Sequence, residues 1–83
     1  MWKASIYVTL KEGVLDPQGQ AVLGSLKQLG FSTLQSVQVG KFITVELAAG
    51  SRAEAESQVE AICQRLLVNS VLEDYSYRLE VVL

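Results

Sequence analysis

The sequence has no histidine and a single cysteine, Cys63, among its 83 residues. Without histidine or a second cysteine, the common zinc sites, the Ser-His and Cys-His nucleophile systems and an intramolecular disulfide are excluded. Cys63 falls on the apolar stripe of an expected helix, so we interpret it as a buried structural thiol. A Gly-rich loop followed by Lys and Ser or Thr, which would hold ATP phosphates, is also absent. The sequence therefore predicts a chain without catalytic, cofactor-binding or metal-binding residues of its own.

The chain also lacks an excess of basic charge and any long apolar run. Seven Lys and Arg residues against nine Asp and Glu residues give a net charge of −2, which argues against a nucleic-acid-binding surface. No stretch approaches the length of a transmembrane helix, and an alternating pattern follows Lys3 directly, with no secretory leader before it. We therefore expect a cytoplasmic protein that binds neither nucleic acid nor membrane.

Apolar residues, in contrast, are abundant for a chain of this size. They make up 49% of the sequence, and the mean hydropathy is +0.27. A single domain spanning residues 1–83 buries roughly 60 to 65% of its unfolded surface, and such a small domain gains stability from oligomerisation. The composition therefore predicts apolar surface that a partner covers.

Hydrophobic periodicity predicts six elements in the order β-α-β-β-α-β. The expected strands span about 2–11, 34–39, 41–47 and 75–83, and the expected helices follow Asp16 and Ser51. This order is typical of a ferredoxin-like α+β sandwich, in which two helices cover one face of a four-stranded antiparallel sheet. In the first strand, alternate residues face the core: Ala4, Ile6, Val8 and Leu10.

The two helices have recognisable starts and apolar stripes. Asp16-Pro17 predicts the start of the first helix, and Gly30 is a good left-handed cap at its end. Gly19 lies beside the stripe of this helix, where we expect the helix to approach the sheet. Ser51 and Glu54 form a capping box for the second helix. The stripe of the first helix is Val22, Leu26 and Leu29, and that of the second is Ala55, Val59, Ile62, Cys63, Leu66 and Leu67.

The dipeptide Gly40-Lys41 predicts a two-residue hairpin turn between the second and third strands. In that register Val39 lies opposite Phe42, and Val37 lies opposite Thr44. The face of the sheet away from the helices would then be apolar, and contiguous exposed apolar surface usually marks an interface. We expect a homo-oligomer, a dimer or a tetramer, with these candidate self-association residues: Tyr7, Val37, Val39 and Phe42.

Three blocks of sequence resemble the PurS family, the small subunit of phosphoribosylformylglycinamidine synthase in purine biosynthesis. They are K-E-G-V-L-D-P-Q-G at residues 11–19, V-G-K at 39–41 and L-L-V-N-S-V-L-E-D-Y at 66–75. The resemblance extends over essentially the whole chain, at matching spacings. Gln38 departs from the family, in which an arginine often precedes the Gly-Lys turn.

This resemblance implies a non-catalytic subunit that bridges the glutaminase PurQ and the ATP-dependent ligase PurL and assists ammonia transfer. ATP, Mg and glutamine would be used by the complex and not bound by this chain. Asp16 and Asn69 also suit purely structural roles as helix caps, and Lys41 suits a turn. The candidate partner contacts are Lys11, Asp16, Gln18, Lys41, Asn69, Glu73, Asp74 and Tyr75.

Two other functions fit the expected fold, because the fold hosts many functions. One is a dimeric regulatory module that binds a small ligand such as an amino acid, for which Gly13 and Gly19 would supply the glycine-containing loop. The other is a small enzyme of acylphosphatase type. That enzyme needs an anion-binding arginine in the first corner, where this chain has only Lys11.

Overall fold

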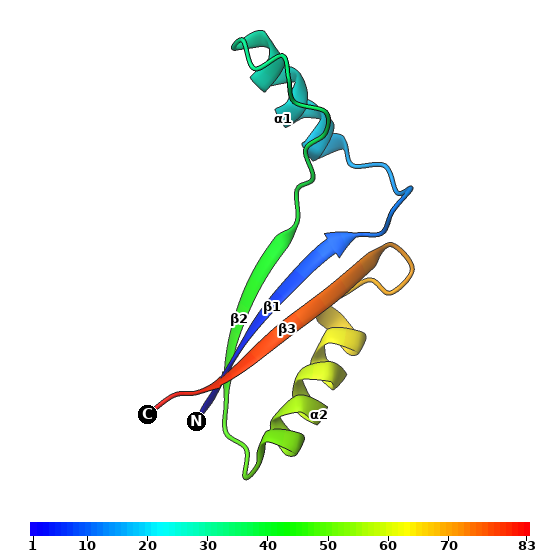
Figure 1. The fold of residues 1–83 in the computed structure, drawn as a ribbon. Coiled ribbons are helices and arrows are strands. Elements are labelled where there is room, and N and C mark those ends of the chain that lie inside the picture. Colours follow the sequence, from blue (N-terminus) through cyan, green and yellow to red (C-terminus); the bar gives the residue numbers. More distant parts are fainter.

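The computed structural model describes residues 1–83 and has three strands with helices on only part of the sheet (Figure 1). The α+β class is therefore confirmed. No helix combines the length and apolar character needed to cross a membrane. In chain order the elements are β1 (Trp2–Leu10), α1 (Pro17–Gln28), β2 (Lys41–Leu47), α2 (Arg52–Ile62), the π-helical turn η1 (Cys63–Leu67) and β3 (Glu73–Val81).

The sheet is antiparallel with the strand order β2-β1-β3, so β1 is central and both neighbours are edge strands. The prediction of a fourth strand is wrong, because residues 34–39 pair with no other strand. The reason lies at Gly40-Lys41, which does not form a turn. Lys41 already lies opposite Val8 in the ladder, and Gly40 approaches the Val8 carbonyl too closely to carry a side chain. The chain therefore runs straight into β2 and does not double back.

The core lies between one face of this sheet and α2. Three of the four predicted inward residues of β1 are buried, since Ala4, Ile6 and Val8 are each at most 1% exposed, whereas Leu10 at the end of the strand is only partly buried. Apolar burial of this kind is the main stabilising contribution to a small domain. The remaining buried hydrophobic residues come from α2, the loop that follows η1, and β3: Ala55, Val59, Cys63, Val68 and Leu79.

The second helix starts as the sequence predicts and ends differently. The Ser51 hydroxyl accepts a hydrogen bond from the Glu54 N–H at 3.2 Å, and the Glu54 carboxylate accepts one from the N–H of Gly50 at 3.0 Å. At the other end the Val68 N–H donates to the Cys63 carbonyl, a π-type bond that adds one residue to the turn. This shift buries Val68 and leaves Leu66 83% exposed, so the prediction that Leu66 packs in the core is wrong.

The chain from residue 17 to residue 39, which we call the arm, projects away from the sheet (Figure 1). It consists of α1 and an extended segment that returns alongside it. The helix α1 starts and ends as predicted, with Pro17 as its first residue and Gly30 following its last turn at a positive φ of 105°. However, α1 has no substantial contact with any strand or with α2, so only one helix covers the sheet. The radius of gyration is accordingly 16.5 Å, against about 12 Å for a compact chain of this length.

Candidate partner-binding site at the hinge of the arm

The arm joins the sheet at two connections, and a pocket of about 300 Å³ lies between them. We call this the hinge pocket. Four of the candidate partner contacts line it, namely Asp16, Gln18, Lys41 and Glu73. Gln18 is exposed. The remaining lining is mostly apolar and comes from Val8, Leu10, Leu15, Pro17, Val39 and Gly40.

Asp16 connects the two sides of the arm. One carboxylate oxygen accepts a hydrogen bond from the Gly19 N–H at 2.9 Å, which is the predicted helix cap. The other oxygen accepts a hydrogen bond from the Val39 N–H at 3.0 Å. The Val39 N–H and then the Gly19 N–H lower the pKa of the Asp16 carboxyl, although partial desolvation opposes this shift. Asp16 is therefore more than a cap, because it fixes the returning segment to the start of α1.

Gly19 allows this close approach within the arm. It is the buried residue of α1, and a Cβ at this position would collide with the Val37 carbonyl oxygen and the Asp16 carboxylate. From the sequence we expect Gly19 to allow close approach of the sheet. Instead, it admits the backbone of the arm's own returning segment.

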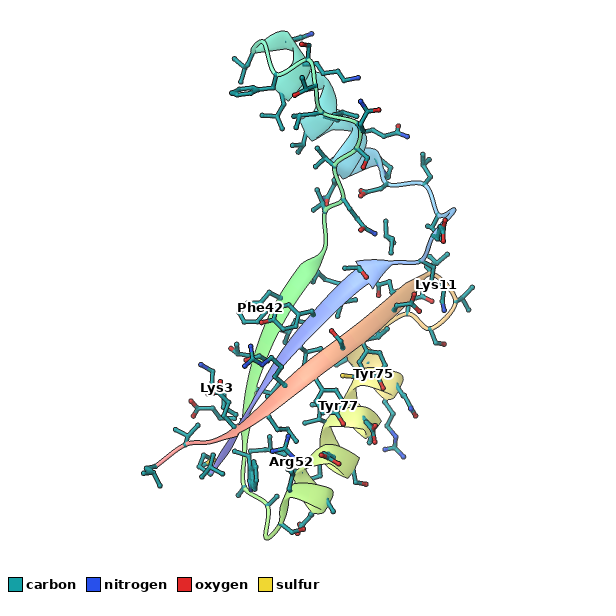
Figure 2. The ribbon with its side chains drawn as sticks, viewed as in Figure 1. Lys3, Lys11, Phe42, Arg52, Tyr75 and Tyr77 are labelled. Atoms are coloured by element: carbon teal, nitrogen blue, oxygen red, sulfur yellow. The ribbon has the colours of Figure 1, made fainter.

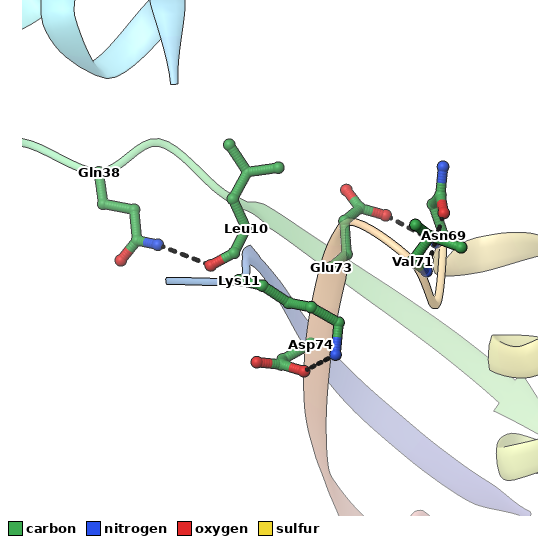
Figure 3. Close-up of polar contacts among 7 residues, drawn as sticks. All are labelled: Leu10, Lys11, Gln38, Asn69, Val71, Glu73 and Asp74. Carbon is green, nitrogen blue, oxygen red and sulfur yellow. Dashed lines mark hydrogen bonds and ion pairs between the residues drawn. The ribbon is translucent and has the colours of Figure 1, made fainter. Parts of the chain in front are cut away.

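Two ion pairs join residues from distant parts of the sequence at the hinge end of the sheet, and one of them, between Lys41 and Glu73, lines the hinge pocket. The Lys11 ammonium lies 2.9 Å from the Asp74 carboxylate, and the Lys41 ammonium lies 3.4 Å from that of Glu73. The register of β1 with β3 brings these groups together, since it places Leu10 opposite Glu73. Figure 3 shows the Lys11–Asp74 pair at the end of the sheet. We call these four side chains the hinge cluster.

The loop before β3 is organised by Asn69 and Glu73. The Asn69 side chain accepts a hydrogen bond from the Val71 N–H at 3.1 Å, and the Glu73 carboxylate accepts one from the Asn69 N–H at 2.8 Å (Figure 3). The Asn69 N–H is the main cause that lowers the pKa of Glu73, and Lys41 adds to it, while desolvation opposes them. Asn69 thus shapes the entry to β3, whereas we expected it to cap the second helix.

Gln38 also contacts the hinge, and no pattern in the sequence predicts this contact. Its side-chain amide donates to the Leu10 carbonyl at 3.0 Å (Figure 3). The bond spans 28 positions of the sequence, from the returning segment to the end of β1. No local pattern could have indicated it, because it depends on how the arm leaves the sheet.

Tyr75 lies apart from the other candidate contacts. It follows Asp74 in β3 and therefore points to the opposite face, where it packs on the edge of the core beside α2 (Figure 2). Its ring stacks against that of Tyr77, with centroids 6.4 Å apart and an interplanar angle of 15°. The structure thus places Tyr75 with the core residues and not at the hinge.

The candidate self-association residues divide into two pairs. Tyr7 and Phe42 are cross-strand neighbours on the sheet face away from α2, with ring centroids 5.0 Å apart. They are 43% and 60% exposed, which is high for aromatic side chains. Val37 and Val39 belong to the arm, so within one chain they do not extend this face as predicted.

The hinge offers charges and hydrogen-bond donors without an activated nucleophile. Cys63 lies in the core, where burial and then Glu60 raise the pKa of its thiol. The structure has no group of three His, Cys, Asp or Glu side chains placed to hold a metal ion.

Comparison with known proteins assigns the chain to a family. The family model described as "PurS: Phosphoribosylformylglycinamidine (FGAM) synthase" matches residues 3–81. The PurS subunit of this synthase from Bacillus subtilis is 40% identical over 80 residues, which cover 96% of this chain and 94% of the relative. The subunit from Archaeoglobus fulgidus is 42% identical over 73 residues, covering 88% of this chain and 91% of the relative.

Solved structures agree with this assignment. "Structure of B. Subtilis PurS C2 Crystal Form" superposes with a TM-score of 0.88 at 40% identity, covering 98% of this chain and all of that one. A chain of "Structure of PurLQS from Thermotoga maritima" superposes with a TM-score of 0.86 at 30% identity, covering 95% of this chain and 96% of that one. The chain therefore belongs to the PurS family, the PurS subunits of phosphoribosylformylglycinamidine synthase.

Proposed function

We propose that the protein is a non-catalytic, cytoplasmic subunit that bridges a PurQ-type glutaminase and a PurL-type ligase. In this role it holds the two larger subunits together and assists the transfer of ammonia between them. ATP, Mg and glutamine are used by the complex, and this chain binds none of them. The similarity to a chain of the Thermotoga maritima PurLQS structure supports the proposal, since that structure contains a PurS-like chain within a larger assembly.

The observation that carries the proposal is the hinge cluster. Lys11, Lys41, Glu73 and Asp74 place two cations and two anions at one end of the sheet, and Lys41 and Glu73 also line a partly apolar pocket. Exposed ion pairs contribute little to folding stability. Charges arranged in this way instead favour recognition of a complementary protein surface, because they set the specificity and the rate of association.

Reconstitution of the synthase with and without this subunit tests the bridging role. Omitting the subunit should abolish product formation from glutamine, because ammonia released by the glutaminase then escapes to solvent. Reaction driven by a high concentration of external ammonia should survive much better, since dissolved ammonia reaches the ligase without a bridge. Equal loss with both nitrogen donors would mean that the subunit shapes the ligase site itself, and would contradict bridging.

Substitutions in the hinge cluster should reproduce this asymmetry. Lys41→Ala and Asp74→Ala should each lower the glutamine-dependent rate by roughly tenfold at limiting subunit concentration, the effect of losing about 1.4 kcal/mol of docking energy. Arg52→Ala is a matched control, because Arg52 forms an exposed ion pair with Glu56 at 3.1 Å on α2, away from the hinge. An equal effect of Arg52→Ala would show that the loss is not specific to the hinge.

The regulatory-module alternative predicts a small ligand in the hinge pocket. The two carboxylates of that pocket are already engaged, since Asp16 accepts two backbone N–H groups and Glu73 bonds both Asn69 and Lys41. A thermal-shift screen against amino acids and nucleotides separates the two functions. A large shift with one compound would favour the regulator over the bridging subunit.

A further inference from the structure

The outer edge of β3 has no hydrogen-bonding partner within the chain. β3 pairs with β1 along its whole length, in nine consecutive residue pairs, and no strand lies on its other side. Between Asp74 and Val81 no backbone N–H or carbonyl group forms a hydrogen bond outside this ladder. Every second residue therefore turns its backbone groups away from β1. Nine residues at about 3.3 Å each give an open edge of roughly 30 Å.

This edge lacks most of the features with which proteins block pairing to an exposed strand. Those features include proline, lysine, a β-bulge and charged side chains that point inward. The β3 sequence E-D-Y-S-Y-R-L-E-V contains neither proline nor lysine, and its register with β1 has no bulge. Its charged residues Asp74, Arg78 and Glu80 all lie on the face away from α2. A long, regular edge of this kind is suited to β-augmentation, in which a partner's extended segment adds a strand to the sheet.

The side of this edge that faces α2 combines aromatic rings with carboxylates. Tyr75 and Tyr77 lie next to each other beside α2 (Figure 2), with ring centroids 6.4 Å apart. Burial, and then Glu60 and Glu56 of α2, raise the pKa of the Tyr77 phenol, which is consistent with both carboxylates lying near it. Glu56 pairs with Arg52, whereas Glu60 is exposed and forms no ion pair. Tyrosine rings and a free carboxylate both attract a lysine or arginine side chain.

The other side of the edge has no preference for one sign of charge. It carries Ser76, Arg78 and Glu80, and neither charged residue forms an ion pair. The edge also starts at the hinge cluster, because Glu73 and Asp74 are the first two residues of β3. A segment bound along β3 would therefore continue the contact surface of the hinge along the sheet.

We infer that the outer edge of β3 binds an extended segment of one of the larger synthase subunits, with lysine or arginine at the alternate positions that face Tyr75, Tyr77 and Glu60. Backbone hydrogen bonds to β3 supply affinity, and the basic side chains set register and specificity. Because the segment comes from a larger subunit, this mode of binding rests on the proposed bridging function.

Amide hydrogen exchange of the wild-type subunit, alone and in a reconstituted complex with the PurL-type and PurQ-type subunits, tests the added strand. The outward amides of β3 should exchange readily in the subunit alone and about tenfold or more slowly in the complex. Unchanged exchange in a complex that makes product from glutamine would overturn the added strand and leave bridging intact. Failure to form any complex would overturn both. Slowing in the isolated subunit that increases with its own concentration would place a second copy on this edge and overturn the proposal.

Charge reversal beside the edge tests the basic character of the bound segment. Glu60→Lys should raise the Kd for one larger subunit by about tenfold or more, because like charges then meet. Glu46→Lys is a matched control, since Glu46 is also exposed and free of ion pairs but lies on β2, at the opposite edge of the sheet. Circular dichroism and light scattering should show that both variants keep the fold and mass of the wild type. Equal affinities of the two variants would overturn the basic segment.

Discussion

Replacing Gly19 with alanine tests whether the returning segment is held against α1. The new Cβ would collide with the Val37 carbonyl oxygen and the Asp16 carboxylate. The Asp16 side chain can rotate, but the Val37 oxygen is part of the backbone and can move only with the segment. Gly19→Ala should therefore separate the two sides of the arm. Gly24→Ala is a matched control in the same helix, because its Cβ would have no neighbour within 4 Å.

The expected free-energy changes of the two variants have opposite signs. Alanine is favoured over glycine in a helix interior by about 1 kcal/mol, so Gly24→Ala should stabilise α1 by about this amount. At Gly19 the same gain is opposed by overpacking, which typically costs about 1 to 3 kcal/mol. A net destabilisation of the arm of up to about 2 kcal/mol follows. Because both variants add one methyl group to one helix, the difference between them isolates the contact with Val37.

Hydrogen exchange of the α1 amides, with helix content from circular dichroism, measures this difference. We expect exchange in α1 to become faster in Gly19→Ala, by up to roughly thirtyfold for 2 kcal/mol, and slower in Gly24→Ala. Urea unfolding of the sheet, followed by Trp2 fluorescence, should change little in a monomeric sample, because α1 has no substantial contact with the core. If Gly19→Ala stabilised α1 as much as Gly24→Ala does, the inferred packing of the arm would be refuted.

Three further predictions concern the arm, the core and the open face. The Val39 and Gly19 N–H groups lower the pKa of Asp16 from its ordinary value of 3.8, so the bond to Val39 should stabilise the arm above about pH 4 and be lost as the pH falls through the lowered pKa. The NMR shift of the Val39 amide should follow this titration in the wild type but not in Asp16→Asn. Val59→Ala should destabilise the protein to urea by about 2 kcal/mol, because Val59 is fully buried, whereas Leu66→Ala should change stability by less than about 0.5 kcal/mol. Phe42→Glu should shift the mass measured by light scattering towards monomer, because it places a charge on the expected self-association face.

Local signals in the sequence were sufficient for the parts of the fold that depend on nearby residues. The start of α1 at Pro17, its end at Gly30 and the Ser51 cap of α2 are each determined by a few neighbouring positions. The inward residues of β1 follow from alternation. Leu66 was placed wrongly because the π turn changes the helical period after Cys63, and the amino acids in the turn do not signal that change.

The candidate site could be predicted only in part. The resemblance to the family indicated Lys11, Lys41, Glu73 and Asp74, but their pairing depends on the register between β1, β2 and β3. The spacing of these four residues along the chain does not determine that register. The contact of Asp16 with Val39 was missed for a related reason, since it joins positions 23 residues apart through the unusual course of the arm.

The error over the fourth strand has a different origin. Residues 34–39 have the alternation of a strand, and Gly40-Lys41 has the composition of a two-residue turn, so local pattern and turn chemistry both favour a hairpin. In the structure Lys41 is already paired opposite Val8, and Gly40 lies against the Val8 carbonyl, so the chain enters β2 without a reversal. The two residues of the dipeptide do not indicate this course, because it depends on where the ladder between β1 and β2 begins. The same course matters for function, because the hinge cluster forms where the arm leaves the sheet.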